Sequence, residues 1–295
     1  MKFTQVSLND SFPLTCTRAG TCCHGNKVLL NPWELYRIAS EKQLPTREFR
    51  DLYTDLNGIQ LRFAGEHQWK GKSVYNQYVD GFGCSVHLGR PLACRLFPLG
   101  RHIQNNQVHY IYEGSQFPCL TDCPEVQDLP HLTVGEYLQG QETKMFEQAQ
   151  DAYLELLQDL ADLAFEFLLE TGLTTAEKLG TLEVWNEMGK ESSESLAQRL
   201  GTTWMDHLMI PMISTDAKHL NEPMTFIIEH AELLQLKIQE NFGTSTTHAE
   251  FQSASIQIMG LSLQLARAIG TDPKALSEQW CEVASGYGTA NQDAN

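Results

Sequence analysis

The sequence predicts a mainly α protein of the α+β class, in which a small, irregular, cysteine-rich metal-binding module with a short hairpin packs on a C-terminal α-helical bundle. Two observations carry this prediction. Seven of the eight cysteines lie in the first half of the 295-residue chain, in turn-rich segments. Further along, apolar residues recur at steps of three and four, the period of a helix with one buried face. We therefore expect a cysteine-rich domain over 1–140 and an α-helical region over 141–295.

The first half contains two helix starts and one hairpin. Segment 31–34, Asn-Pro-Trp-Glu, offers a capping residue, a proline for the first helical position and a carboxylate that can complete a capping box. Thr133 and Glu136 form a second capping box, which opens a short helix. Segments 101–104 and 107–112 flank two asparagines. Because asparagine tolerates positive φ, we expect a two-residue hairpin turn at 105–106.

The second half reads as a series of helices. A long amphipathic helix begins near Met145 and extends to Phe167, with its acidic residues on the other faces. Three more helices are expected at about 193–209, about 222–240 with Asn221 as the cap, and about 250–269. A last helix begins at 272–273, Asp-Pro, and residues 286–295 are expected to be a frayed tail.

The composition argues against two classes of partner. Net charge is −16 and Lys plus Arg are outnumbered 21 to 37 by Asp plus Glu, so the dense basic face that nucleic acid requires is not expected. No signal peptide and no run of about 20 uncharged apolar residues is found, so we expect no membrane association and a cytoplasmic location. Thiols are kept reduced there, and clustered cysteines then indicate metal binding or catalysis rather than disulfides.

The clustered cysteines fall into three groups, which glycines and prolines interrupt. Such irregular backbone suits a metal site, because the chain must fold tightly around an ion and aim several thiolates inward. Five or more sulfurs exceed one tetrahedral zinc site, which leaves room for an iron–sulfur cluster, for two metals, or for a thiol with another role. The candidate ligands, group by group, are Cys16, Cys22 and Cys23; Cys84 and Cys94; and Cys119 and Cys123.

Neighbouring residues extend this hypothesis. Arg90 and Arg95 stand beside the second cysteine group, where guanidinium groups would keep thiols deprotonated and help to bind a cofactor; the alternative is pairing with local acidic residues. His24 and His87 lie inside the motifs and could complete a coordination sphere or lie outside it. Cys281, which stands alone on an expected helix, is interpreted as a small buried hydrophobe.

The motif strings resemble a known family. Cys16-x-x-Ala-Gly-x-Cys-Cys23 and Cys84, followed by Arg90-Pro-x-x-Cys-Arg-x-Phe-Pro98, are similar to the CxxCxxCC (YkgJ-like) family of zinc- or iron-chelating proteins. The resemblance covers roughly residues 12–140. Ala19 stands where the family usually has its second cysteine, and residues 75–78 stand where a further cysteine often occurs. These departures make Cys119 and Cys123 candidate replacements.

The resemblance also implies functions. The same family includes flagellin lysine N-methylases, which are associated with an oxygen-sensitive iron–sulfur cluster and with methyl transfer from S-adenosylmethionine. It therefore implies a 4Fe–4S cluster, with zinc as the alternative, and a methyltransferase-like or redox activity with a protein as substrate. The other functional class is a structural zinc-binding module whose helical half docks a protein partner. The sequence leaves both classes open.

Overall fold

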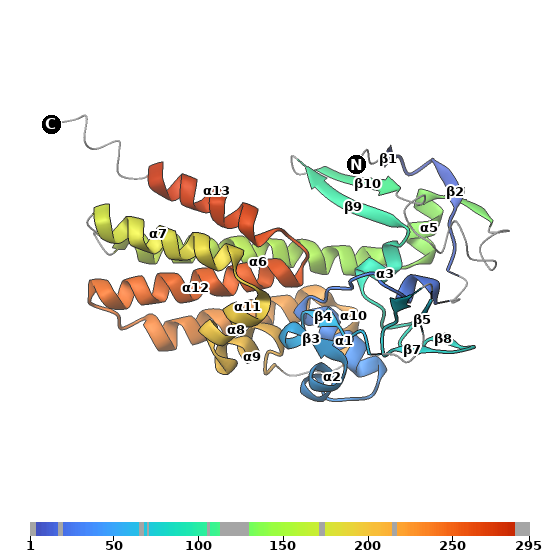
Figure 1. The fold of residues 1–295 in the computed structure, drawn as a ribbon, viewed down its shortest axis with the longest axis horizontal. Coiled ribbons are helices and arrows are strands. Elements are labelled where there is room, and N and C mark those ends of the chain that lie inside the picture. Colours follow the sequence, from blue (N-terminus) through green and yellow to red (C-terminus); the bar gives the residue numbers. More distant parts are fainter. Residues whose placement is uncertain are drawn as a thin grey trace. The chain divides into compact units, whose positions relative to one another are not determined.

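The computed structural model describes residues 4–16, 20–64, 68–69, 71–104, 107–112, 130–170, 175–213 and 217–286 (Figure 1). Helices form most of the described chain, and the strands form few and small sheets, so the mainly α prediction is confirmed. The chain divides into two compact units. The first comprises 1–30, 36–55 and 60–148, and the second comprises 31–35, 56–59 and 149–295. The expected tail beyond Gly286 lies outside the described residues.

Short segments of the N-terminal half thus belong to the second unit. The sequence predicts a single division of the chain, near residue 140, and gives no sign that segments 31–35 and 56–59 belong to the second unit. Its cause is visible at Trp33, which is fully buried and whose indole N–H donates to the carbonyl of His219 at 2.8 Å. A buried indole needs such an acceptor, and this one lies 186 residues away in the sequence.

The first unit contains a three-stranded antiparallel sheet, in the order β1 (Thr4–Val6), β10 (Gln107–Tyr112), β9 (Leu99–Gln104). Gln104 pairs with Gln107, so the two strands expected around 105–106 are confirmed, while the two turn residues themselves lie outside the described part. The other sheets have two strands each. They are β2 (Ser11–Pro13) with β11 (His131–Thr133), β3 (Thr54–Asp55) with β4 (Gln60–Leu61), β5 (Gln68–Trp69) with β6 (Lys72–Ser73), and β7 (Tyr78–Val79) with β8 (Gly83–Cys84).

Both capping boxes form as expected. At the start of α1 (Pro32–Glu41), Glu34 N–H donates to Asn31 Oδ1 at 2.9 Å, and Asn31 N–H donates to Glu34 Oε2 at 3.1 Å. Thr133 and Glu136 make the same pair of bonds at the start of α5 (Val134–Gly140). Each box satisfies amide donors that a helix start leaves open. Helices α2 (Thr46–Tyr53) and α3 (Leu92–Leu96) and the 3-10 turns η1 (Thr21–Cys23) and η2 (Leu56–Gly58) were not expected; they are one or two turns long and carry little periodicity.

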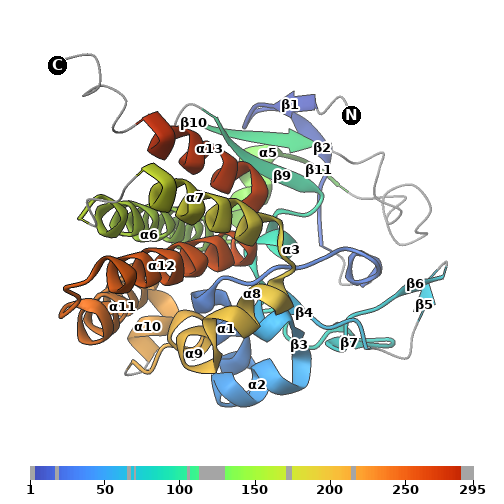
Figure 2. The ribbon, with the colours of Figure 1, turned by 60° about the vertical axis from the view of Figure 1, so that its left-hand side comes forward.

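The second unit is a set of helices around α12 (His248–Ala268), whose residues Ile258, Leu261 and Leu265 are fully buried. Figure 2 shows α12 between α7 and α11. Hydroxyl groups of Ser255 and Ser262 donate to carbonyls of α6 at 2.9 and 2.7 Å, which satisfies them inside the apolar core. The remaining helices are α6 (Thr143–Glu170), α7 (Thr175–Lys190), α8 (Ser193–Leu200), α9 (Thr202–Met209), α10 (Ala217–Asn221), α11 (Pro223–Phe242) and α13 (Pro273–Gly286).

Two helix predictions for this half are wrong in detail. The expected helix at 193–209 is two helices, because Gly201 adopts φ 84° and ends α8. Asn221 does not cap α11; it is the last residue of α10, and α11 begins at Pro223. Helix α7 was missed, since Gly180 and Gly189 weaken its helical signal. The long helix from Met145, the helix near 250–269 and the last helix are confirmed.

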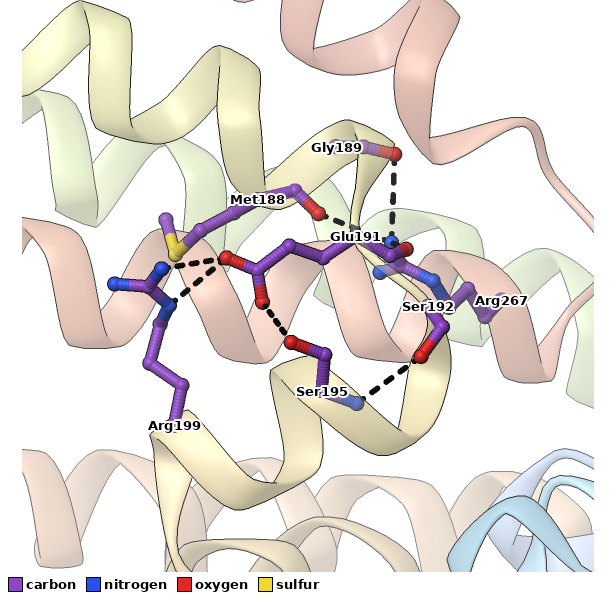
Figure 3. Close-up of polar contacts among 7 residues, drawn as sticks. All are labelled: Met188, Gly189, Glu191, Ser192, Ser195, Arg199 and Arg267. Carbon is purple, nitrogen blue, oxygen red and sulfur yellow. Dashed lines mark hydrogen bonds and ion pairs between the residues drawn. The ribbon is translucent and has the colours of Figure 1, made fainter.

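A charged network closes the end of α7 (Figure 3). Arg267 of α12 donates to the carbonyls of Met188 and Glu191 at 3.0 and 2.8 Å, so a guanidinium satisfies carbonyls that the helix end leaves open. The Glu191 carboxylate in turn accepts from Arg199 Nη2 at 2.5 Å and from the Ser195 hydroxyl at 2.9 Å.

No helix among the described residues is both long and apolar enough to span a bilayer.

Candidate metal centre

The first cysteine segment is held in a tight turn by a glycine. Gly20 has φ 78°, and a Cβ there would lie 2.2 Å from the ring of Tyr78, so the close approach requires glycine. The turn closes with Cys23 N–H donating to Gly20 O at 2.8 Å. In the resulting 3-10 turn, the thiol of Cys23 hydrogen-bonds the sulfur of Cys22. The backbone at the adjacent cysteines is therefore bent into a turn and not extended.

The second segment reaches the first through Tyr78 and Tyr75. Tyr78 pairs with Cys84 across the β7–β8 hairpin, and Tyr75 N–H donates to Cys23 O at 3.2 Å. Cys94 lies one turn into α3 and its N–H donates to Pro91 O at 3.0 Å. The β7–β8 pairing and the hydrogen bond from Tyr75 to Cys23 thus connect two cysteine groups that are some 60 residues apart in the sequence.

The cysteines of the first two groups affect one another's pKa values. The hydrogen bond from Cys23 lowers the pKa of Cys22 despite burial, and the same bond, followed by burial, raises the pKa of Cys23. Negative charge on Cys94 and Cys84 raises the pKa of Cys23 further. Burial raises the pKa of Cys84, and charge on Cys22 and Cys16 adds to this increase. Charges on neighbouring cysteines therefore contribute to the pKa shifts of Cys23 and Cys84.

Arg90 lies beside these thiols. It is only 8% exposed. Its positive charge adds to the effect of the Cys23 hydrogen bond in lowering the pKa of Cys22, and it offsets part of the rise that burial causes in the pKa of Cys84. Nη1 donates to His87 O at 2.6 Å and Nη2 donates to Gln141 Oε1 at 2.5 Å. The Nε–H group, however, is buried and has no hydrogen-bond partner among the described residues. A buried N–H of this kind is costly unless an acceptor occupies the site.

Arg95 has a different environment. Its guanidinium donates to the backbone carbonyls of Arg90, Leu88 and Gln141 at 2.9, 2.6 and 2.6 Å, and it lies over the ring of Phe146 at 4.0 Å. Burial, and then the neighbouring charge of Arg90, lowers its pKa to about 10. Arg95 therefore holds the segment that carries Arg90, while Arg90 keeps a buried N–H without an acceptor among the described residues.

Cys16 and His87 contact each other at an exposed position of the candidate site. Cys16 is exposed, whereas Cys22, Cys23 and Cys84 are partly buried. The sulfur of Cys16 lies 3.4 Å from Nε2 of His87. His24, the other candidate histidine, is buried, and its Nδ1–H donates to Gly20 O at 3.1 Å, which supports the turn.

The donor chemistry suits a soft metal, but the described geometry is not a closed coordination site. Among the described residues, no three or more Cys, His, Asp or Glu side chains are arranged to hold a metal ion. Cys22 and Cys23 are hydrogen-bonded to each other, and the proton that this bond requires must leave before both sulfurs can bind a cation. Cys119 and Cys123 lie outside the described residues, as do residues 17–19 beside Cys16.

Two residues of this site were not predicted. Burial, and then charge on Cys94 and Cys23, raises the pKa of Tyr75, and its hydroxyl donates to the carbonyl of Asn26. In the sequence, Tyr75 is only the first of the residues 75–78 that stand where the family often has a further cysteine. Gln141, which accepts from both arginines, gives no signal in the sequence because its role depends on contacts made far along the chain.

Cys281 lies in the second unit and fits the structural interpretation. Its thiol donates to Leu182 O at 3.3 Å, joining α13 to α7, and burial raises its pKa to about 11. A thiol that stays protonated is a poor nucleophile and a poor metal ligand.

Comparison with models of protein families, with curated proteins and with solved structures finds no match to this chain.

Proposed function

We propose that the cysteines of the first unit bind a metal centre, foremost an iron–sulfur cluster, with a single structural zinc ion as the alternative. The observation that carries this proposal is the buried guanidinium of Arg90, whose charge acts on Cys22 and Cys84 and whose Nε–H has no partner among the described residues. Thiolate is the usual ligand of both centres.

The charge balance supports an anionic centre. A buried arginine is costly when nothing compensates its charge. Four thiolates around a zinc ion, or around an iron–sulfur cluster, carry net negative charge, and Arg90 would neutralise part of it and donate Nε–H to a sulfur. Neutral thiols would not compensate the charge of Arg90 and would be weaker acceptors for its Nε–H. We therefore favour a metal-loaded state with ionised cysteines.

The number of sulfurs favours a cluster over one zinc ion. Cys16, Cys22, Cys23, Cys84 and Cys94 already exceed the four ligands of tetrahedral zinc, before Cys119 and Cys123 are considered. A cluster would account for four of them and leave one sulfur for another role. Methyl transfer from S-adenosylmethionine rests on the family resemblance alone, and we do not include it in this proposal.

Anaerobic purification tests the proposal. We expect brown protein that contains iron and acid-labile sulfide, with Cys94→Ser losing the metal and Cys281→Ser retaining it as the matched control. Stoichiometric zinc without iron would establish the alternative. Absence of any bound metal, after reconstitution with iron and sulfide and separately with zinc, would refute both forms.

A further inference from the structure

The contacts of His87 with Cys16 and Arg90 indicate which ring nitrogen of His87 carries the proton. His87 makes polar contacts through both ring nitrogens: Nε2 lies 3.4 Å from Cys16 Sγ, and Nδ1 lies 3.2 Å from Nη1 of Arg90. A neutral imidazole has one nitrogen that donates and one that accepts. Which nitrogen does which decides whether His87 gives a proton to the thiol or receives one.

Arg90 decides between the two tautomers. A guanidinium has only donors and does not lose its proton in proteins. Nη1 uses one N–H on His87 O at 2.6 Å, and its contact with Nδ1 therefore requires Nδ1 to accept. The ring proton must then reside on Nε2, the nitrogen that faces Cys16. Arg90 is itself held by Gln141 and is almost fully buried, so the arrangement is fixed from behind.

We propose that His87 is a positioning residue that donates its Nε2–H to the sulfur of Cys16, in a tautomer set by Arg90, and that it is not a metal ligand. The inference rests on the proposed function in so far as Cys16 is a metal ligand. An N–H donor orients the sulfur that it contacts, and Cys16, the exposed cysteine among the described candidate ligands, is thereby held in place by His87. With its proton already on Nε2, neutral His87 cannot serve as the base that deprotonates Cys16.

The tautomer is tested first in the metal-free, reduced full-length protein. Two-bond correlations between ring nitrogens and carbon-bound ring protons show which nitrogen of a histidine carries the proton, and His87→Gln identifies the signal by its loss. We expect protonated Nε2 and unprotonated Nδ1. A proton on Nδ1 would overturn the inference whatever the protein binds.

The second arm titrates the same metal-free protein with Co²⁺ against a competing chelator, since Co²⁺ bound by thiolates absorbs visible light. His87→Ala should weaken Co²⁺ binding about 10- to 100-fold, the usual cost of losing a hydrogen-bond partner of a ligand. His87→Gln, which keeps an N–H near Nε2, should recover most of this loss. His102→Ala, at an exposed position of β9, is the control and should bind as the wild type does.

The outcomes separate the two hypotheses. If His87→Gln is as weak as His87→Ala, the ring nitrogen is itself a ligand and the inference is wrong. If His87→Ala binds Co²⁺ as tightly as the wild type, the inference is also wrong. If the wild type binds neither Co²⁺ nor iron, the proposed function fails, and the tautomer measurement still decides whether His87 donates to Cys16.

Discussion

His230 provides the sharpest test of the second unit. It is fully buried in α11, its Nε2–H donates to His207 O at 3.0 Å, and its Nδ1 accepts from the Tyr153 hydroxyl at 3.1 Å. Both nitrogens are thus satisfied in the neutral form, and a second proton would remove the acceptor that Tyr153 uses. Burial lowers the pKa of His230 from 6.5 to about 4.

This shift predicts a loss of stability in acid. Between pH 6.5 and pH 4 the unfolded chain takes up a proton at His230 and the folded chain does not, so the free energy of unfolding falls as the pH falls. The contribution is complete above pH 6.5 and is lost as the pH approaches 4. With about 1.4 kcal/mol for each pH unit, a difference of about 2.5 units corresponds to about 3 kcal/mol.

Urea denaturation followed by far-ultraviolet circular dichroism at a series of pH values measures this contribution. Carboxylates titrate over the same range, so the informative quantity is the wild-type free energy minus that of His230→Gln. This difference should fall by about 3 kcal/mol from pH 7 to pH 4. Tyr153→Phe is the matched control: it removes the hydroxyl's hydrogen bonds to His230 and to the Trp33 backbone, costs about 1–3 kcal/mol, and should keep the pH dependence. A difference between wild type and His230→Gln that does not vary with pH would refute the reasoning.

Three further predictions concern glycines and the metal. Gly189→Ala should destabilise the protein by about 1–3 kcal/mol, because its methyl group would lie 2.0 Å from Ser277 Oγ. Gly180→Ala in the same helix meets open space and should stabilise the protein by about 0.5–1 kcal/mol. If the urea midpoints of the two variants shifted in the same direction, this reasoning would be wrong. Gly20→Ala should reduce metal content while the second unit unfolds as in the wild type, since φ 78° and the Tyr78 ring exclude a side chain; full metal content would count against the site. Removing metal should raise amide hydrogen exchange in the first unit and spare the helices of the second, and a uniform rise would show that the metal does not act locally.

Local signals explain what the sequence could predict of the fold. Capping boxes at Glu34 and Glu136 depend on residues three positions apart, so they can be read directly, and they form as expected. Features that depend on distant contacts were missed. Gly201 was included within one helix because periodicity continues on both sides of it, and the break is a matter of backbone angle. Trp33 joins the second unit through a carbonyl that lies 186 residues further on.

The candidate site shows the same limit. Spacing and flanking residues single out the cysteines and Arg90 as candidates, and whether they bind a metal stays a prediction. The tautomer of His87 and the role of Gln141 follow from contacts that a one-dimensional pattern does not contain. Sequence reasoning treated Arg90 and Arg95 alike, whereas the structure gives one an unused buried donor and the other a full set of carbonyl acceptors.

The position of Gln141 has a consequence for synthesis. Both arginines depend on it, through the Arg90 contact with its side chain and the Arg95 contact with its carbonyl, yet it follows Cys16 by 125 residues. At about 5–20 residues per second, a ribosome adds Gln141 about 6–25 s after Cys16. During that interval the first cysteines emerge from the ribosome before Gln141 has been added. Their thiols are then accessible to oxidants and to other metal ions. Under the proposed function, loading of the centre would therefore be a late event, and its efficiency should depend on how reducing the surroundings of the growing chain are.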